Sequence, residues 1–194
     1  SLSSHPTSSH QGPQFRIATL NLRGVDITLR TLSDTIHRQS SPPDILVLTE
    51  THLNPTTVRR FLPLSSYHMY HTTVTDSPAR AGVTIAIHHR LHYLTHAEEP
   101  RIPDLLQGYL KIVDLHYPDK QILRLIGLYV PPTPQDSVRL KYLYQYLTAQ
   151  LAPSLTAVSR GPTFLAGDFN VVLHPSERTG PFLNTPQTRL LRTL

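Results

Sequence analysis

Four short apolar runs in this chain each end at a polar side chain capable of chemistry. Apolar stretches of this length predict β-strands, and the polar residue marks the place where each strand leaves its sheet. If the four strands share one sheet edge, they bring two carboxylates, two amides and a phenol to one concave site. The runs and their polar residues are 15–20 with Asn21, 44–49 with Glu50, 121–130 with Tyr129, and 162–166 with Asp168 and Asn170.

The rest of the pattern predicts helices and antiparallel strand pairs. Leucine and isoleucine at spacings of three and four residues indicate amphipathic helices, and a proline is expected to end the longest one. Apolar runs bounded by turn-forming residues indicate strands. The expected helices are 28–38, 137–151 (ending at Pro153) and 188–194, the expected strand pairs are 67–72 with 82–87 and 105–115 with 121–130, and residues 171–173 briefly extend the last strand.

The composition indicates one globular domain after a flexible tail. The chain has 194 residues, of which 39% are hydrophobic, and this is enough for one core. Residues 1–13 are almost free of apolar side chains, so we expect a flexible tail there and a domain over 14–194. No apolar run approaches the roughly 20 residues that span a bilayer, and no signal-peptide pattern opens the sequence. We therefore expect neither a membrane partner nor secretion.

Charge and side-chain chemistry narrow the choice of partner and metal. The net charge is +5 and most cations are arginine, whose planar guanidinium suits phosphate oxygens, so nucleic acid is a plausible partner. Coding bias is the alternative explanation, because the cations are scattered. With no cysteine there is no thiolate metal site, and the 12 histidines lack convincing ligand spacing. Oxygen and amide donors at the strand ends favour Mg²⁺ or Mn²⁺.

The stretch Gly167-Asp168-Phe169-Asn170 carries the clearest local signal. Gly167 permits a sharp turn, and the Asp-x-Asn spacing points both side chains the same way if the backbone stays extended. Such a site suits phosphate ester hydrolysis, in which a cation neutralises the phosphate, a carboxylate orients water and amides stabilise the developing charge. Structural explanations stay open: an Asx turn at Asp168, a solvated Glu50, and a Tyr129 that packs beneath a loop.

Four motifs together resemble the endonuclease/exonuclease/phosphatase superfamily, and they occur in the family's order. The resemblance covers the chain from residue 15 to its end, although Ala81 replaces a glycine in a further motif, Arg80-Ala81-Gly82-Val83. Residues 49–53 and 171–180 look most like the apurinic/apyrimidinic-type endonuclease domains of non-LTR (LINE-type) retrotransposons. The four motifs are Leu20-Asn21-Leu22-Arg23-Gly24, Leu48-Thr49-Glu50-Thr51-His52-Leu53, Leu128-Tyr129-Val130-Pro131-Pro132 and Gly167-Asp168-Phe169-Asn170.

The resemblance implies an α/β (α+β) fold, a four-layer αββα sandwich of the DNase I-like type, whose second half is incomplete here. It also implies Mg²⁺-dependent nicking of DNA in the nucleus, which leaves a 3′-hydroxyl to prime a reverse transcriptase in the same polyprotein. The implied roles are metal binding by Glu50 with support from Asn21, orientation or deprotonation of the attacking water by Asp168, and contact with the phosphate or the DNA by Asn170, Tyr129 and Arg23.

Two other functions remain open. A phosphatase or phosphodiesterase that acts on small-molecule or lipid phosphates would use the same metal and water. A non-catalytic nucleic-acid-binding remnant would bind DNA weakly and in a salt-sensitive way, without turnover. A plasmid-nicking assay beside a panel of phosphomonoesters separates these possibilities.

We predict that these 194 residues alone cleave DNA poorly or not at all. The resemblance implies a further aspartate and an S-D-H-like motif, whereas the sequence has no histidine after His174, which lies too close to Asp168 to fill that role. We therefore expect a domain truncated before the final catalytic histidine motif. Mg²⁺-dependent nicking of supercoiled plasmid measures this, and robust cleavage that Asp168→Ala abolishes would contradict it.

Overall fold

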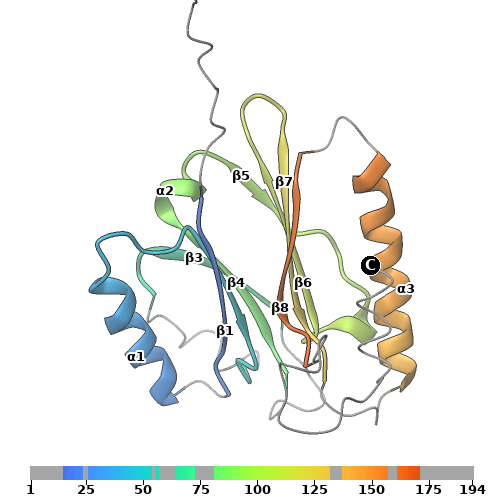
Figure 1. The fold of residues 1–194 in the computed structure, drawn as a ribbon, viewed down its shortest axis with the longest axis horizontal. Coiled ribbons are helices and arrows are strands. Elements are labelled where there is room, and N and C mark those ends of the chain that lie inside the picture. Colours follow the sequence, from blue (N-terminus) through green and yellow to red (C-terminus); the bar gives the residue numbers. More distant parts are fainter. Residues whose placement is uncertain are drawn as a thin grey trace, which may run out of the picture.

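The strands form two four-stranded sheets that face each other (Figure 1). The computed structural model describes residues 15–23, 26–53, 56, 64–72, 81–131, 137–156 and 161–170. The first sheet has the order β1-β2-β4-β3 and the second has the order β5-β6-β7-β8. The strands are β1 (Ile17–Asn21), β2 (Ile45–Thr49), β3 (Tyr67–Thr72), β4 (Val83–His88), β5 (His96–Glu98), β6 (Leu110–His116), β7 (Ile122–Tyr129) and β8 (Thr163–Asp168).

One long helix covers the outer face of each sheet (Figure 1). Helix α1 (Asp26–His37) packs through Ile36 against Leu46 and Leu48 of the first sheet. Helix α3 (Ser137–Thr156) packs a leucine stripe against the second sheet. This arrangement confirms the predicted four-layer αββα sandwich. The shorter helical segments are α2 (His89–His92) and the 3-10 turn η2 (Asp104–Leu106).

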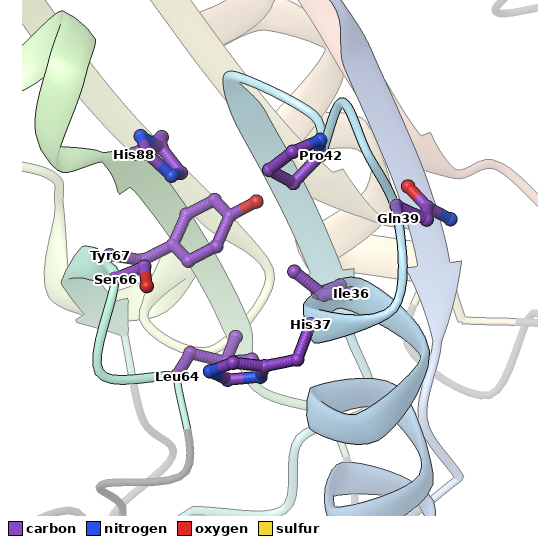
Figure 2. A pocket seen from close by; sticks show the side chains of 8 residues that line it. All are labelled: Ile36, His37, Gln39, Pro42, Leu64, Ser66, Tyr67 and His88. Carbon is purple, nitrogen blue, oxygen red and sulfur yellow. The ribbon is translucent and has the colours of Figure 1, made fainter.

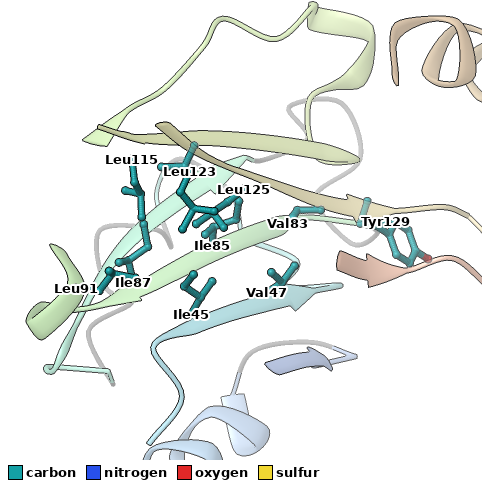
Figure 3. Packing of buried hydrophobic residues seen from close by; sticks show 12 residues of the cluster. Ile45, Val47, Val83, Ile85, Ile87, Leu91, Leu115, Leu123, Leu125 and Tyr129 are labelled. Atoms are coloured by element: carbon teal, nitrogen blue, oxygen red, sulfur yellow. The ribbon is translucent and has the colours of Figure 1, made fainter. Parts of the chain in front are cut away.

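The core between the sheets explains why β2 is apolar on both faces. Ile45 and Val47 belong to the cluster that fills the space between the sheets, with Leu125 on the opposite side (Figure 3). The alternate residues of β2 pack beneath α1. A strand that is covered on both sides needs a continuous apolar run, and residues 44–49 provide one.

Strand pairing follows the predicted pattern. β3 pairs with β4 and β6 pairs with β7 in antiparallel registers, as expected for the two strand pairs. β1 lies parallel to β2, and β7 lies parallel to β8. Because parallel strands end at the same edge of a sheet, each parallel pair delivers two of the predicted polar strand ends together.

Two predicted boundaries differ from the structure by more than two residues. The strand expected at 105–115 begins only at Leu110, because η2 and a turn through Gly108, with φ of +81°, occupy the preceding residues. The helix expected to end at Pro153 continues to Thr156. Proline has a φ compatible with a helix and removes only its own N–H donor, so the last turn can form beyond it.

Several predicted segments lie outside the described residues. These are the flexible tail at 1–13, the strand extension at 171–173 and the helix at 188–194. Within the described part of the chain, no helix is both long enough and apolar enough to cross a membrane.

A partly buried polar cluster lies where β3 approaches β6. Nδ1 of His71 lies 2.8 Å from Oγ1 of Thr84, and the ammonium group of Lys111 pairs with Glu99. Burial and, secondarily, the charge of Lys111 lower the pKa of His71 to about 4, while Glu99 acts in the opposite direction. His71 is therefore neutral in the folded protein at neutral pH.

We predict that the free energy of unfolding decreases as the pH falls from about 6.5 to about 4. In this window the unfolded chain protonates residue 71 whereas the folded chain does not, so protons favour unfolding. The loss attributable to His71 is roughly 3 kcal/mol, since one pKa unit corresponds to about 1.4 kcal/mol. Urea denaturation across this pH range measures it.

The matched variants are His71→Asn, which should flatten the pH dependence, and His37→Gln, which changes an exposed histidine of α1 and should leave it as in the parent. An equally steep pH dependence in His71→Asn would show that another group is responsible.

Candidate active site

The four predicted strand ends meet at one end of the sandwich. In the first sheet Asn21 lies beside Thr49, directly before Glu50, and in the second sheet Tyr129 lies beside Asp168. β1 and β8 also contact each other, although they belong to different sheets. The two pairs of strand ends therefore form one cluster.

The side chain of Asn21 connects the two carboxylates of this cluster. Its Nδ2 donates to Oε1 of Glu50 at 2.7 Å and to Oδ2 of Asp168 at 2.6 Å. Its Oδ1 accepts a hydrogen bond from the backbone N–H of Arg23 at 3.0 Å, which fixes the orientation of the amide. Both carboxylates thus lie within hydrogen-bonding distance of a single nitrogen atom.

Glu50 enters the cluster because β2 turns sharply at its end. Glu50 has φ of +51°, and so does His52, a conformation that is uncommon for residues other than glycine. The turn is held by backbone hydrogen bonds from Thr51 to Gly82 and from His52 to Ala81. Unusual backbone geometry of this kind is often found at functional sites, where the surrounding structure maintains it.

Gly167 allows β8 to deliver Asp168 to the same place. Its φ is +149°, and a Cβ atom at this position would lie 1.9 Å from the carbonyl oxygen of Leu128. Beyond it, the carbonyl oxygen of Asp168 accepts a hydrogen bond from the N–H of Val130 at 2.8 Å. Only glycine fits this close approach of β8 to β7.

The predicted Asx turn and the predicted site coexist at Asp168. Its Oδ1 accepts from the backbone N–H of Asn170 at 2.9 Å, while its Oδ2 accepts from Asn21. The extended backbone that would make Asp168 and Asn170 point the same way does not persist, because the strand ends at Asp168 and Asn170 has φ of +47°. The side-chain amide of Asn170 instead donates to the carbonyl of Val130 at 2.7 Å.

Tyr129 lies at the end of the core between the sheets (Figure 3) and is only 7% exposed. Burial raises the pKa of its phenol far above the usual value, and the charge of Glu50 together with a hydrogen bond to Glu50 raises it further. Smaller contributions come from Asp168 and Tyr109. Tyr129 therefore both packs in the core and presents a neutral hydroxyl donor to Glu50.

Arg23 and His52 lie at the margin of the cluster. Arg23 is exposed, and its backbone rather than its guanidinium holds Asn21 in the described structure. Nε2 of His52 lies 3.9 Å from Oε2 of Glu50, a contact that sequence reasoning missed. The signal was present, since His52 follows Glu50 in the motif Thr49-Glu50-Thr51-His52-Leu53.

The donor set fits a small, hard divalent cation. Carboxylate and amide oxygens are the ligands of Mg²⁺ and Mn²⁺, which retain several water molecules and need few protein ligands. Glu50 and Asp168 supply the carboxylates, whereas Asn21 directs its amide nitrogen at them and its amide oxygen at the N–H of Arg23. In the described ranges no group of three or more histidine, aspartate or glutamate side chains forms a metal-binding cluster, so a histidine-rich zinc site is not indicated there.

Two cavities formed by described residues lie away from the strand-end cluster. One of about 170 Å³ lies between α1 and the first sheet and is lined by residues such as Ile36, Tyr67 and His88 (Figure 2). Another of about 260 Å³ is lined by residues that include Phe15, Tyr117 and Pro162. Neither is lined by a residue of the strand-end cluster, which is therefore a separate feature of the molecule.

Comparisons with known proteins agree with this fold. Residues 18–190 match the model of the Endonuclease/Exonuclease/phosphatase family. No curated protein sequence matches the chain.

Several solved structures share the fold. The AP endonuclease LMAP from Leishmania major is 20% identical, with a TM-score of 0.62, over 90% of this chain and 60% of that one. The Xenopus laevis APE2 catalytic domain is 18% identical, with a TM-score of 0.63, over 92% and 67%. The 3′ phosphatase NExo from Neisseria, bound to a product DNA hairpin, is 20% identical, with a TM-score of 0.63, over 92% and 69%. The chain thus spans about 60% of the length of the Leishmania protein.

Proposed function

The chain belongs to the endonuclease/exonuclease/phosphatase family, and on that premise we propose that it is a DNA endonuclease domain that depends on Mg²⁺ or Mn²⁺. The observation that carries the proposal is the joint hydrogen bonding of Glu50 and Asp168 to Asn21. Two carboxylates from different sheets that share one donor nitrogen support a site at which one cation and one phosphate could bind together.

In this proposal each side chain has a distinct task. Glu50, with support from Asn21, would hold the cation. A cation bound there would neutralise the negative charge of the phosphate. Asp168 orients or deprotonates the attacking water, and its carboxylate is fixed on both oxygens by Asn21 and by the N–H of Asn170. A base held on both oxygens keeps the geometry that proton transfer requires.

Neutral hydrogen-bond donors and an arginine bind the phosphate in this proposal. The raised pKa of Tyr129 keeps its hydroxyl protonated, so it can exchange its hydrogen bond to Glu50 for one to a phosphate oxygen without adding negative charge. Asn170 lies beside Asp168, and Arg23 is exposed next to Asn21. The net charge of +5 favours approach of a polyanion such as DNA.

We place this activity in a LINE-type retrotransposon, where a nick with a 3′-hydroxyl would prime reverse transcription in the nucleus. The support is the similarity of residues 49–53 and 171–180 to such endonuclease domains. In this setting the partners would be target DNA and a reverse transcriptase domain of the same polyprotein.

A phosphomonoesterase is the second candidate. One similar structure is described as a 3′ phosphatase bound to a DNA hairpin, and the same donors suit any phosphate ester. The two functions differ in which phosphate ester is hydrolysed faster.

We predict slow nicking of supercoiled plasmid that requires Mg²⁺ or Mn²⁺ and disappears in Asp168→Ala. DNA polymerase should extend the nicks directly, because each carries a 3′-hydroxyl. Lys141→Ala, an exposed change on α3, is the matched control and should nick at the parental rate.

The same samples are incubated with 3′-phosphorylated oligonucleotides and small phosphomonoesters. Faster release of inorganic phosphate than of nicked plasmid would favour the phosphatase. Salt-sensitive DNA binding with neither hydrolysis of any of these esters nor binding of Mn²⁺ at Glu50 would contradict the enzymatic proposal and favour a binding remnant.

A further inference from the structure

A chain of contacts runs from the outer helix α3 to the candidate active site. Arg139, in the first turn of α3, reaches Tyr109, and Tyr109 stacks on Tyr129. Tyr129 in turn forms a hydrogen bond with Glu50. Arg139 lies on the outer helix α3, and Tyr109 lies directly before β6, beside Tyr129 at the end of β7.

Tyr109 is held firmly from the side of α3. Nη1 of Arg139 donates to the hydroxyl of Tyr109 at 2.9 Å, and the guanidinium carbon lies 4.5 Å from the centre of the ring. Nε of Arg139 also donates to the carbonyl of Leu105 at 3.0 Å. The planar guanidinium can stack on a ring while it donates to a hydroxyl and to a carbonyl, and a compact ammonium group does not reproduce this geometry.

Tyr109 in turn restrains Tyr129. Their ring centres are 6.1 Å apart and the ring planes differ by 28°. The backbone N–H of Tyr129 donates to the carbonyl of Tyr109 at 2.8 Å, so the backbone and the ring of Tyr129 are fixed by the same neighbour. A stacked neighbour limits rotation of the Tyr129 ring and hence the direction of its hydroxyl.

We propose that Arg139 and Tyr109 are positioning residues that hold the ring of Tyr129 so that its hydroxyl, which bonds Glu50 in this structure, can donate to the phosphate of the substrate instead. The proposal rests on the function proposed above, because it assigns Tyr129 a contact with that phosphate. Neither residue touches the reacting atoms. Their effect reaches the reaction through the orientation of Tyr129, and a small misplacement of such a group costs up to about a hundredfold in rate.

Kinetics with Arg139→Ala and Tyr109→Leu test this role. We expect kcat to fall roughly tenfold to a hundredfold in each variant while KM stays within about twofold, because substrate binding is preserved and orientation is lost. Arg139→Lys and Tyr109→Phe should retain more activity than the larger changes, since each keeps part of the contact. Lys141→Ala removes a cation from the same helix and should match the parent.

A measurement without turnover separates this proposal from the proposed function. Tb³⁺ binds hard oxygen ligands and luminesces when a nearby tyrosine absorbs light, so Tb³⁺ at Glu50 and Asp168 reports on Tyr129. Tyr129→Phe should abolish most of the signal. Arg139→Ala, which removes no tyrosine, should lower the luminescence of each bound ion while leaving the affinity for Tb³⁺ within about twofold.

The outcomes distinguish the two proposals. Lower luminescence in Arg139→Ala supports the positioning role even if no preparation cleaves DNA, which is a failure of the proposed function alone. Parental luminescence in Arg139→Ala, or parental kcat in both Arg139→Ala and Tyr109→Leu, would overturn the positioning role even if the parent cleaves DNA as proposed.

Discussion

The hydrogen bonds from one amide group, that of Asn21, join the two sheets at the candidate active site. Two carboxylates, Glu50 from the first sheet and Asp168 from the second, accept from the same nitrogen. Two carboxylates that share one donor repel each other, and a hydrogen-bond donor or a cation between them offsets this repulsion. The amide of Asn21 supplies part of this stabilisation, and we propose that a divalent ion supplies the rest.

The surrounding backbone gives this cluster its geometry. Glu50 has φ of +51°, and β2 can turn there because Gly82 lies against Thr51, where a Cβ atom would come within 2.4 Å of the threonine hydroxyl oxygen. Gly167 brings Asp168 close to β7 in the second sheet. Between the sheets, Gly127 faces Val83, and an added Cβ would lie 2.8 Å from that side chain. Small residues thus set the distances on which the carboxylate pair depends.

Much of the fold could be predicted from the sequence because it depends on local patterns. The continuous apolar run of β2 specifies a strand that is buried on both faces, and the leucine spacing of α3 specifies a helix on an apolar surface. The strand ends of β1, β2, β7 and β8 were also accessible, since each apolar run stops at a polar residue. Their meeting at one edge depends on two parallel pairings, β1 with β2 and β7 with β8, that the pattern does not specify.

The features that the sequence did not predict depend on tertiary contacts or on backbone conformation. The side chain of Asn170 turns to the carbonyl of Val130 because the backbone leaves the extended conformation at that residue. The contact between Arg139 and Tyr109 joins residues 30 positions apart and carries no sequence signal. The continuation of α3 past Pro153 shows that a proline near a helix end is a weak stop.

In our proposal Glu50 binds one divalent cation, and the adjacent charge of Asp168 strengthens that binding. Titration with Mn²⁺, followed by electron paramagnetic resonance of the free ion, measures it in the parent, in Glu50→Gln, in Asp168→Asn and in the double variant. We expect one site in the parent, a loss of roughly tenfold or more in affinity for each single variant, and a double variant whose loss is not the sum of the two. Parental affinity in both single variants would contradict it.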